Sequence, residues 1–242
     1  IYKVRSNFAH EIDASLEILV EKRIEHQPIA QIIGKREFWG MNFVVSENTL
    51  DPRPDSETLI EYVLERVKNR ASSLRILDLG TGTGCLLLSL LSELPAAKAV
   101  GVDYCEKALL IAKENAMALG LTGRVDFIRS DWCENIVGEF DIIISNPPYI
   151  PSSDIAMLAP EVSQFEPRLA LDGGEDGFSC YRKIIKSLPK IMAKDGFVAF
   201  ELGIGQQREM EVLATENGLE VVGVRHDLGG IARCIILQHK VA

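Results

Sequence analysis

The sequence has no pair of cysteines at the C-x-x-C spacing. Its five cysteines are scattered along 242 residues, and its four histidines show no metal-ligand spacing either. These absences exclude the common zinc fingers and ribbons, and isolated cysteines are typical of reduced thiols in the cytoplasm. We therefore predict a cytoplasmic protein without a metal site.

Positive charge is also scarce. The chain has 26 Lys and Arg residues against 35 Asp and Glu residues, which gives a formal net charge of −9. A chain with this balance is a poor candidate for broad contact with a phosphate backbone. No apolar run approaches the ~18 residues that a membrane-spanning helix needs, and no secretory signal is recognisable. We expect a monomer with no stable nucleic-acid partner and no membrane partner.

What the chain does have, from residue 74 onward, is an alternation of apolar strands and amphipathic helices. Strands are predicted near 75–79, 99–103, 125–129, 140–145, 197–201, 220–225 and 233–238, and helices near 84–94, 106–119, 178–194 and 206–217. Such alternation predicts an α/β fold with a parallel sheet. Residues 227–231 are too few for a crossover helix, so the last two strands should pair antiparallel. Five parallel strands followed by a hairpin resemble the Rossmann-like fold of class I methyltransferases.

The first 50 residues follow a different pattern. Residues 11–27 have helical spacing of apolar positions, and residues 32–45 alternate around a turn at Trp39-Gly40, which predicts a β-hairpin. A single amphipathic helix cannot bury its apolar face alone. We therefore predict three parts: residues 1–31 as the remainder of a small helical unit, 32–50 as a β-hairpin linker, and 51–242 as the main domain.

A glycine-rich turn joins the first strand of that domain to its first helix. It reads Gly80-Thr81-Gly82-Thr83-Gly84 and follows an acidic residue, Asp78, in the strand. Dinucleotide-binding folds have the spacing G-x-G-x-x-G and place a pyrophosphate on the helix N-terminus. The shorter spacing and the preceding carboxylate favour a cationic nucleoside, S-adenosyl-L-methionine, over a nicotinamide dinucleotide.

Three more polar or aromatic residues follow the next two strands. Asp103 ends the second strand, where its carboxylate can accept both hydroxyls of a ribose, and Asp131-Trp132 follow the third. The Asp131 carboxylate can accept an adenine amino group and the Trp132 ring can cover the base. The alternatives are a loop cap for Asp131 and a hydrophobic plug for Trp132.

Asn146-Pro147-Pro148-Tyr149 follow the fourth strand and are the most specific run in the chain. Each proline lacks an N–H but keeps its carbonyl, and the asparagine side chain adds one more acceptor. The run resembles the Asn/Asp-Pro-Pro-Tyr motif of methyltransferases that modify planar amino groups. The simpler alternative is a proline-rich turn with a surface tyrosine. Because parallel strands end at one edge of a sheet, we expect this run to lie beside the glycine-rich turn.

The chain resembles the glutamine-N5 methyltransferases that modify peptide release factors, over nearly all of residues 28–238. The motifs that carry the resemblance are EFWG at 37–40, PRPDSE at 52–57, DLGTGTG at 78–84, SDW at 130–132, SNPPYI at 145–150 and FEPRLAL at 165–171. Asp51 stands where the family usually has an apolar residue. Residues 227–233 also depart from the family's Asp-Leu-Ala-Gly-Arg-Asp-Arg stretch.

The resemblance implies methyl transfer from S-adenosyl-L-methionine to the glutamine of the Gly-Gly-Gln motif in class 1 release factors, with S-adenosyl-L-homocysteine as product. Asn146 Oδ1 and the Pro147 carbonyl would accept the amide hydrogens, and Tyr149 would pack on the target. Phe38 and Arg53 would line the entrance, with core packing and loop rigidity as their alternatives. The competing hypotheses are a base amino-methyltransferase acting on DNA or RNA, a non-catalytic S-adenosylmethionine-binding module and a nicotinamide-dependent oxidoreductase.

Overall fold

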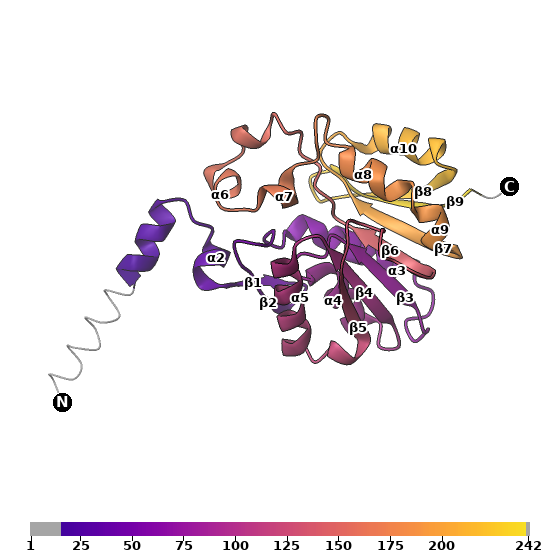
Figure 1. Cartoon of the computed structure of the whole chain (residues 1–242), viewed down its shortest axis with the longest axis horizontal. Helices are drawn as coiled ribbons and strands as arrows, with labels where there is room; N and C mark the ends of the chain where they lie inside the picture. The colour runs from indigo at the N-terminus through magenta and orange to yellow at the C-terminus, as the bar shows by residue number, and fades with distance from the viewer. Residues whose placement is uncertain (1–15, 241–242) are drawn as a thin grey trace.

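The computed structural model describes residues 16–240, and its centre is a seven-stranded sheet of order β5-β4-β3-β6-β7-β9-β8 (Figure 1). The strands are β3 (Arg75–Leu79), β4 (Lys98–Asp103), β5 (Val125–Arg129), β6 (Phe140–Ser145), β7 (Met192–Glu201), β8 (Leu219–His226) and β9 (Ala232–His239). The pairs among β3 to β7 are parallel, and β9 pairs antiparallel with both β7 and β8. This confirms the predicted α/β architecture, including the terminal hairpin.

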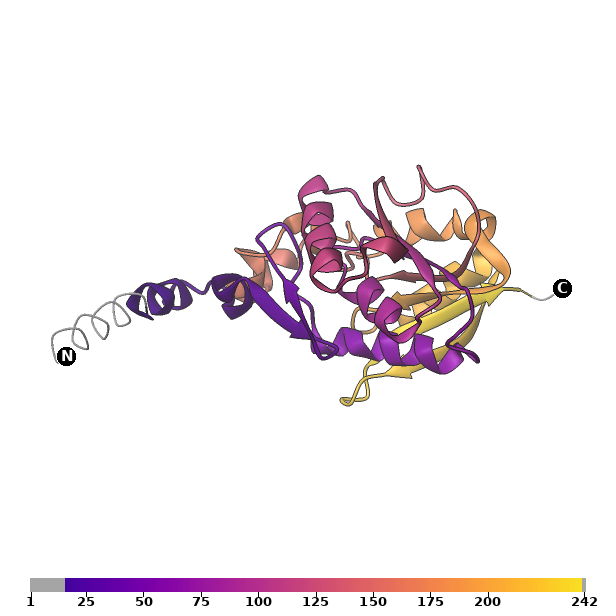
Figure 2. The same cartoon turned by 90° about the horizontal axis from the view of Figure 1, so that it is seen from below.

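Helices cover both faces of the sheet (Figures 1 and 2). One core cluster joins the sheet to α3 (Glu57–Arg66), α4 (Cys85–Glu93) and α5 (Glu106–Ala118). The second joins it to α8 (Ser179–Ile185), α9 (Leu188–Ile191) and α10 (Gln207–Glu216). Alternate residues of the buried strands contribute to the two clusters, as a side-chain period of two requires.

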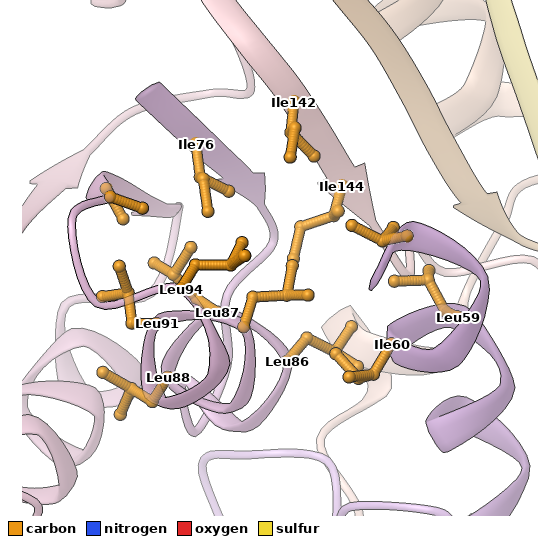
Figure 3. Packing of buried hydrophobic residues seen from close by; sticks show 14 of the residues in the cluster. Leu59, Ile60, Ile76, Leu86, Leu87, Leu88, Leu91, Leu94, Ile142 and Ile144 are labelled. Atoms are coloured by element: carbon orange, nitrogen blue, oxygen red, sulfur yellow. The ribbon is translucent and has the colours of Figure 1, made fainter. Parts of the chain in front are cut away.

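Figure 3 shows the first cluster. Leucines of α4 pack against Leu59 and Ile60 of α3 and against Ile76, Ile142 and Ile144 of the sheet. The α4 sequence CLLLSLLSE is apolar on almost every side, and six of its residues (86–91) are buried. A helix enclosed in this way holds its N-terminus, and the glycine-rich turn before it, in a fixed position relative to the strand ends.

The predicted hairpin is present as β1 (Lys35–Phe38) and β2 (Met41–Val44). Its turn residues Trp39 and Gly40 have φ of 53° and 69°, the left-handed values that two-residue hairpin turns require. Phe38 and Phe43 are 1% and 0% exposed and join the core cluster of α3 and α4. The Trp39 indole donates a hydrogen bond to Glu93 at 3.2 Å. The hairpin is thus packed onto the main domain by its own core residues.

Two element predictions differ from the structure. The helix predicted over 178–194 is divided into α8 and α9, and β7 already begins at Met192. Pro189 lies in the first turn of α9; it has no N–H to continue the preceding helix and so favours a new start. Of the helix predicted over 11–27, residues 16–24 are helical and residues 11–15 lie outside the described residues.

The remaining elements are short: α2 (Ile29–Ile33), α6 (Pro160–Ser163), α7 (Arg168–Leu171) and the 3-10 turns η1 (Pro54–Ser56), η2 (Thr122–Arg124) and η3 (Ile155–Met157). The helix at 16–24 projects from the body in both views (Figures 1 and 2). An ion pair of 2.9 Å between Arg23 and Glu161 connects it to α6. Within residues 16–240, no helix is both long and apolar enough to cross a membrane.

Candidate active site

A cavity of about 590 Å³ lies at the carboxyl ends of the parallel strands. Most residues predicted from the sequence line it: Arg53, Gly80, Thr81, Gly82, Thr83, Asp103, Asp131, Trp132, Asn146 and Pro148. Parallel strands end at one edge of the sheet, and open α/β sheets bind their ligands there. Sequence motifs separated by up to 95 positions therefore meet in one place.

The glycine-rich turn is held by backbone hydrogen bonds to the neighbouring strand. The N–H groups of Gly80 and Thr81 both donate to the Val102 carbonyl, at 2.9 and 2.8 Å. Gly80, Gly82 and Gly84 have φ of 80°, 54° and 79°, values that residues with a side chain rarely adopt. Gly84 does not line the cavity. A Cβ there would lie 3.2 Å from a Leu88 methyl, so this glycine serves helix packing.

Asp103 closes the side of the cavity at the end of β4. Its two carboxylate oxygens accept the N–H groups of Gly82 at 2.9 Å and Cys105 at 2.8 Å. Each carboxylate oxygen has a second lone pair, so the group can still accept ligand hydroxyls. Burial raises the pKa of Asp103, and the backbone hydrogen bonds oppose that rise.

The segment after β5 has an unusual backbone. Trp132 has φ of 50°, which is uncommon for a residue with a bulky side chain and is often found at functional sites. The indole lies 3.4 Å from the position that a Cβ on Gly80 would take, so the ring covers the glycine-rich turn. Asp131 forms an ion pair of 3.5 Å with Lys183 of α8, a cavity residue that the sequence interpretation did not single out.

The Asn-Pro-Pro-Tyr run only partly reaches the cavity wall. Asn146 and Pro148 line it, whereas Pro147 is buried behind them. Tyr149 lies against the turn after β7: a Cβ on Gly203 would be 2.8 Å from its ring. Burial raises the pKa of Tyr149 to about 12, so the phenol stays protonated at neutral pH.

The two residues predicted to line the entrance have different positions. Arg53 lines the cavity and pairs with the buried carboxylate of Glu166. Phe38 is enclosed in the core, edge-on to Phe43 with ring centroids 6.2 Å apart. A side chain enclosed in this way does not reach the entrance, so the prediction for Phe38 was wrong and its core-packing alternative holds.

The charges around the cavity fit a cationic nucleoside. Its wall contains four carboxylates (Asp51, Asp103, Asp131 and Asp172) and only two cations, Arg53 and Lys183. Directly behind the turn, the buried carboxylate of Asp78 accepts the Thr81 hydroxyl at 2.6 Å, while its Oδ1 has no partner among the described residues. An excess of acceptors beside side-chain-free glycines suits a ligand with hydroxyls, an amine and a positive charge.

Sequence reasoning missed Glu201, which ends β7 beside the cavity and is 3% exposed. Asp78 and Asp103 also lie at or near the carboxyl ends of their strands. The signal that could have found Glu201 was therefore available: an acidic residue closing an apolar strand at the ligand-binding edge.

Comparisons with known proteins agree with this geometry. The model of the "Methyltransferase small domain" matches residues 36–162. A release factor glutamine methyltransferase of Rhodospirillum rubrum is 43% identical over 228 residues, covering 94% of this chain and 70% of the relative. One from Agrobacterium fabrum is 41% identical, covering 93% and 79%.

The chain belongs to the release factor glutamine methyltransferase family. A ribosomal protein L11 methylase of Lactobacillus delbrueckii has the same fold, with a TM-score of 0.59 at 19% identity over 79% of this chain and 83% of that one. The protein is therefore an enzyme of the methyltransferase class, and the cavity is its candidate active site.

The buried carboxyls of this methyltransferase make its stability depend on pH. Burial raises the pKa of Asp78, Glu166 and Glu201 to about 7, and it also raises those of Asp51 and Asp103. A carboxyl whose pKa is raised on folding stabilises the fold fully below the unfolded value, 3.8 for Asp and 4.5 for Glu. That contribution is lost as the pH rises through the folded value.

We therefore expect the melting temperature of the ligand-free protein to fall between pH 5 and pH 8. Carboxylates with lowered pKa values lose their contribution only at lower pH. Differential scanning calorimetry in buffers of equal ionic strength measures the slope. A melting temperature that rises over this interval would contradict the expected neutralisation of these groups on folding.

Proposed function

We propose that this enzyme transfers a methyl group from S-adenosyl-L-methionine to the side-chain amide nitrogen of the glutamine in the Gly-Gly-Gln motif of class 1 peptide release factors. The observation that carries the proposal is the position of Asn146. Asn146 directly follows β6 and lines the same cavity as the glycine-rich turn and Asp103. The names of the relatives support glutamine as the acceptor.

The chemical demand on the protein is to position an amide. An amide nitrogen is a poor nucleophile because its lone pair is delocalised into the carbonyl. When bound, S-adenosylmethionine supplies an activated methyl group and leaves as a neutral thioether. The protein must therefore hold the nitrogen in line with the methyl group and stabilise the positive charge that develops on it.

In this proposal, Asn146 Oδ1 and the Pro147 carbonyl perform this role. Each accepts one hydrogen of the target NH2 group, which fixes the amide plane and favours a more pyramidal nitrogen. Pro147 and Pro148 have no backbone N–H, so no main-chain donor of these two residues competes with the target NH2 group for the acceptors. The proton leaves to solvent after the transfer, so no dedicated general base is required. Pro148 and Arg53, which line the cavity, contribute the surrounding contacts to the target side chain.

The cofactor would be held by the remaining cavity residues. Gly80, Thr81, Gly82 and Thr83 offer backbone groups at close approach, and Asp103 accepts the ribose hydroxyls. Asp131 accepts the adenine amino group, and Trp132 covers the base. Asp131 would exchange part of its contact with Lys183 for that amine.

Partners and location follow from the same proposal. The enzyme acts as a cytoplasmic monomer in translation termination, with release factors as its protein substrate and no stable nucleic-acid or membrane partner. Residues 1–31 contribute to docking that substrate, and residues 51–242 carry the chemistry. Leu16, Ile18 and Ile24 on the projecting helix are more than half exposed, which supports a docking role.

The function is tested by methyl transfer from labelled S-adenosylmethionine to a purified release factor. We expect one methyl group per acceptor and none when the motif glutamine is replaced by alanine in the acceptor. Duplex and single-stranded DNA of matched adenine content serve as competing acceptors. Transfer to DNA, or equal transfer to the glutamine-free acceptor, would exclude the proposed substrate.

Asp103→Ala is expected to weaken the binding of S-adenosylhomocysteine by about 1–3 kcal/mol, because the ribose hydroxyls lose a charged acceptor. Asp126→Ala on the exposed side of β5 is the matched control, since Asp126 does not line the cavity. Isothermal titration calorimetry measures both. Equal affinity in the Asp103 variant and the wild type would remove Asp103 from the cofactor site.

A further inference from the structure

Glu201 ends β7 immediately beside the strand that carries Asn146. In the parallel β6–β7 pair, Ser145 is opposite Phe200. Asn146 directly follows β6 and Glu201 is the last residue of β7, so the two lie side by side at the end of this strand pair. Glu201 is 3% exposed, and a buried carboxylate is costly unless nearby groups hydrogen-bond to it.

The surroundings of Glu201 hold it firmly. Ser56 and Asn146 lie close enough to its carboxyl to lower its pKa, and Oε2 is enclosed without a partner among the described residues. The Tyr181 hydroxyl donates to its backbone carbonyl at 2.6 Å. On the opposite side, Cys234 of β9 pairs with it in the sheet.

A carboxamide has two ends of similar size, and only one of them suits the reaction. Asn146 must present Oδ1 to the substrate NH2 group, because Nδ2 would meet it donor to donor. An ionised carboxylate can only accept hydrogen bonds, so Glu201 attracts Nδ2–H and turns Oδ1 toward the cavity.

We propose that Glu201 is a positioning residue that sets the orientation of the Asn146 carboxamide for methyl transfer. This inference rests on the proposed function and extends it to a residue that touches neither substrate nor cofactor. Removing the carboxylate leaves Asn146 free to rotate between a productive and an unproductive orientation.

The protonation state of Glu201 gives this role a pH signature. Burial raises the pKa of Glu201 to about 7, opposed by Ser56, Arg233 and Asn146 and assisted by Asp55. Tyr149, Tyr181, Cys85 and Cys234 also face it, and burial keeps their pKa values above the usual range. Protonated Glu201 can donate to Oδ1 instead of accepting from Nδ2. The rate of methyl transfer should therefore fall as the pH drops through about 7.

The first test is Glu201→Gln, assayed by single-turnover methylation of a release factor from pH 6 to pH 9. A glutamine can accept or donate, so the preference is lost. We expect the rate at pH 8.5 to fall by about 10–100-fold, as when a residue that orients a metal ligand is replaced. The apparent KM for the release factor and the affinity for S-adenosylhomocysteine should not change, and the decline below pH 7 should disappear.

Glu166→Gln is the matched control, because Glu166 is also buried and its pKa is also raised to about 7, but it pairs with Arg53. In the Glu166→Gln variant, the rate of methyl transfer should still fall below pH 7. Ser56→Ala provides a second variant that retains Glu201. Without the Ser56 hydroxyl, which lowers the pKa of Glu201, the decline in rate should move to higher pH.

The decisive test combines substitutions at Asn146 and Glu201 in one double variant. Asn146→Asp places a second carboxylate beside that of Glu201, and the two negative charges repel each other. In the double variant Asn146→Asp/Glu201→Gln, the glutamine NH2 group donates to the new aspartate and restores an oriented acceptor. At pH 8.5 the double variant should be at least about fivefold faster than Asn146→Asp alone, although Glu201→Gln by itself slows the enzyme.

A decline below pH 7 in Glu201→Gln that matches the wild type overturns the inference, as does a double variant no faster than Asn146→Asp. Either result leaves the proposed function intact, provided that the wild type still methylates the release factor. A wild-type enzyme that binds S-adenosylhomocysteine but transfers no methyl group to the factor overturns the proposed function instead.

Discussion

Asn146→Ala is expected to lower the single-turnover rate of release factor methylation by about 10²–10³-fold, the typical effect of losing one preorganised group that stabilises developing charge. The variant loses one of the two acceptors that hold the target nitrogen. Its fold should persist, because Asn146 lies at a strand end and partly exposed on the cavity wall. Docking of a protein-sized substrate involves much more surface, so KM should change less than kcat.

The experiment needs two controls. Circular dichroism and S-adenosylhomocysteine binding confirm that the variant is folded and that its cofactor site is intact. Asn48→Ala is the matched variant, since Asn48 also lines the cavity but lies on the loop after β2. A rate for Asn146→Ala above about a tenth of the wild-type rate would show that this carboxamide does not hold the reacting nitrogen.

Gly177→Ala should displace the backbone of the Asn-Pro-Pro-Tyr run from the side that faces away from the cavity. Gly177 has φ of 79°, and a Cβ there would lie 2.4 Å from the Tyr149 carbonyl oxygen. A left-handed alanine costs about 1–2 kcal/mol by itself, and the overlap must also move the backbone of the Asn-Pro-Pro-Tyr run. We expect a loss of at least about 2 kcal/mol in the free energy of unfolding. Because displacements of ~1 Å can cost ~100-fold in rate, we also expect transfer to slow by about 10–100-fold.

Gly123→Ala tests whether this effect depends on position. A Cβ on Gly123 meets nothing within 4 Å, and its φ lies outside the left-handed region. Urea unfolding and the methyl-transfer assay should leave that variant close to the wild type. If Gly177→Ala has the stability and rate of Gly123→Ala, then the loop at 173–179 does not support the Asn-Pro-Pro-Tyr backbone.

The position of the site could be predicted from the sequence because it depends on strand order and strand ends. Asp103, Asp131 and Asn146 each follow an apolar run that the pattern identifies as a strand. In a parallel sheet those ends meet whatever the loop details. The same logic applied to the acidic end of 197–201 would have identified Glu201.

Other features could not be predicted because they depend on packing. Phe38 lies on the apolar face of the hairpin, opposite Met41, but the sequence does not show whether that face meets the cavity or the core, and in the structure it joins the core cluster of α3 and α4. The left-handed backbone of Trp132 accompanies a contact of its ring with Gly80, 52 positions earlier. Pro189, by contrast, is a local signal in the sequence against the single long helix predicted over 178–194.

The place of β9 in the sheet has a consequence for how the enzyme is made. β9 follows β8 in the sequence, yet it lies between β7 and β8 in the sheet and supplies Arg233, which pairs with Asp55 and Asp227 beside the site. On the ribosome, β7 must keep an open edge until residues 232–239 emerge, and an open edge invites pairing with other chains. A nascent chain without β9 therefore lacks both the sheet closure and the Arg233 contacts. Catalytic competence should therefore appear only after β9 has been synthesised.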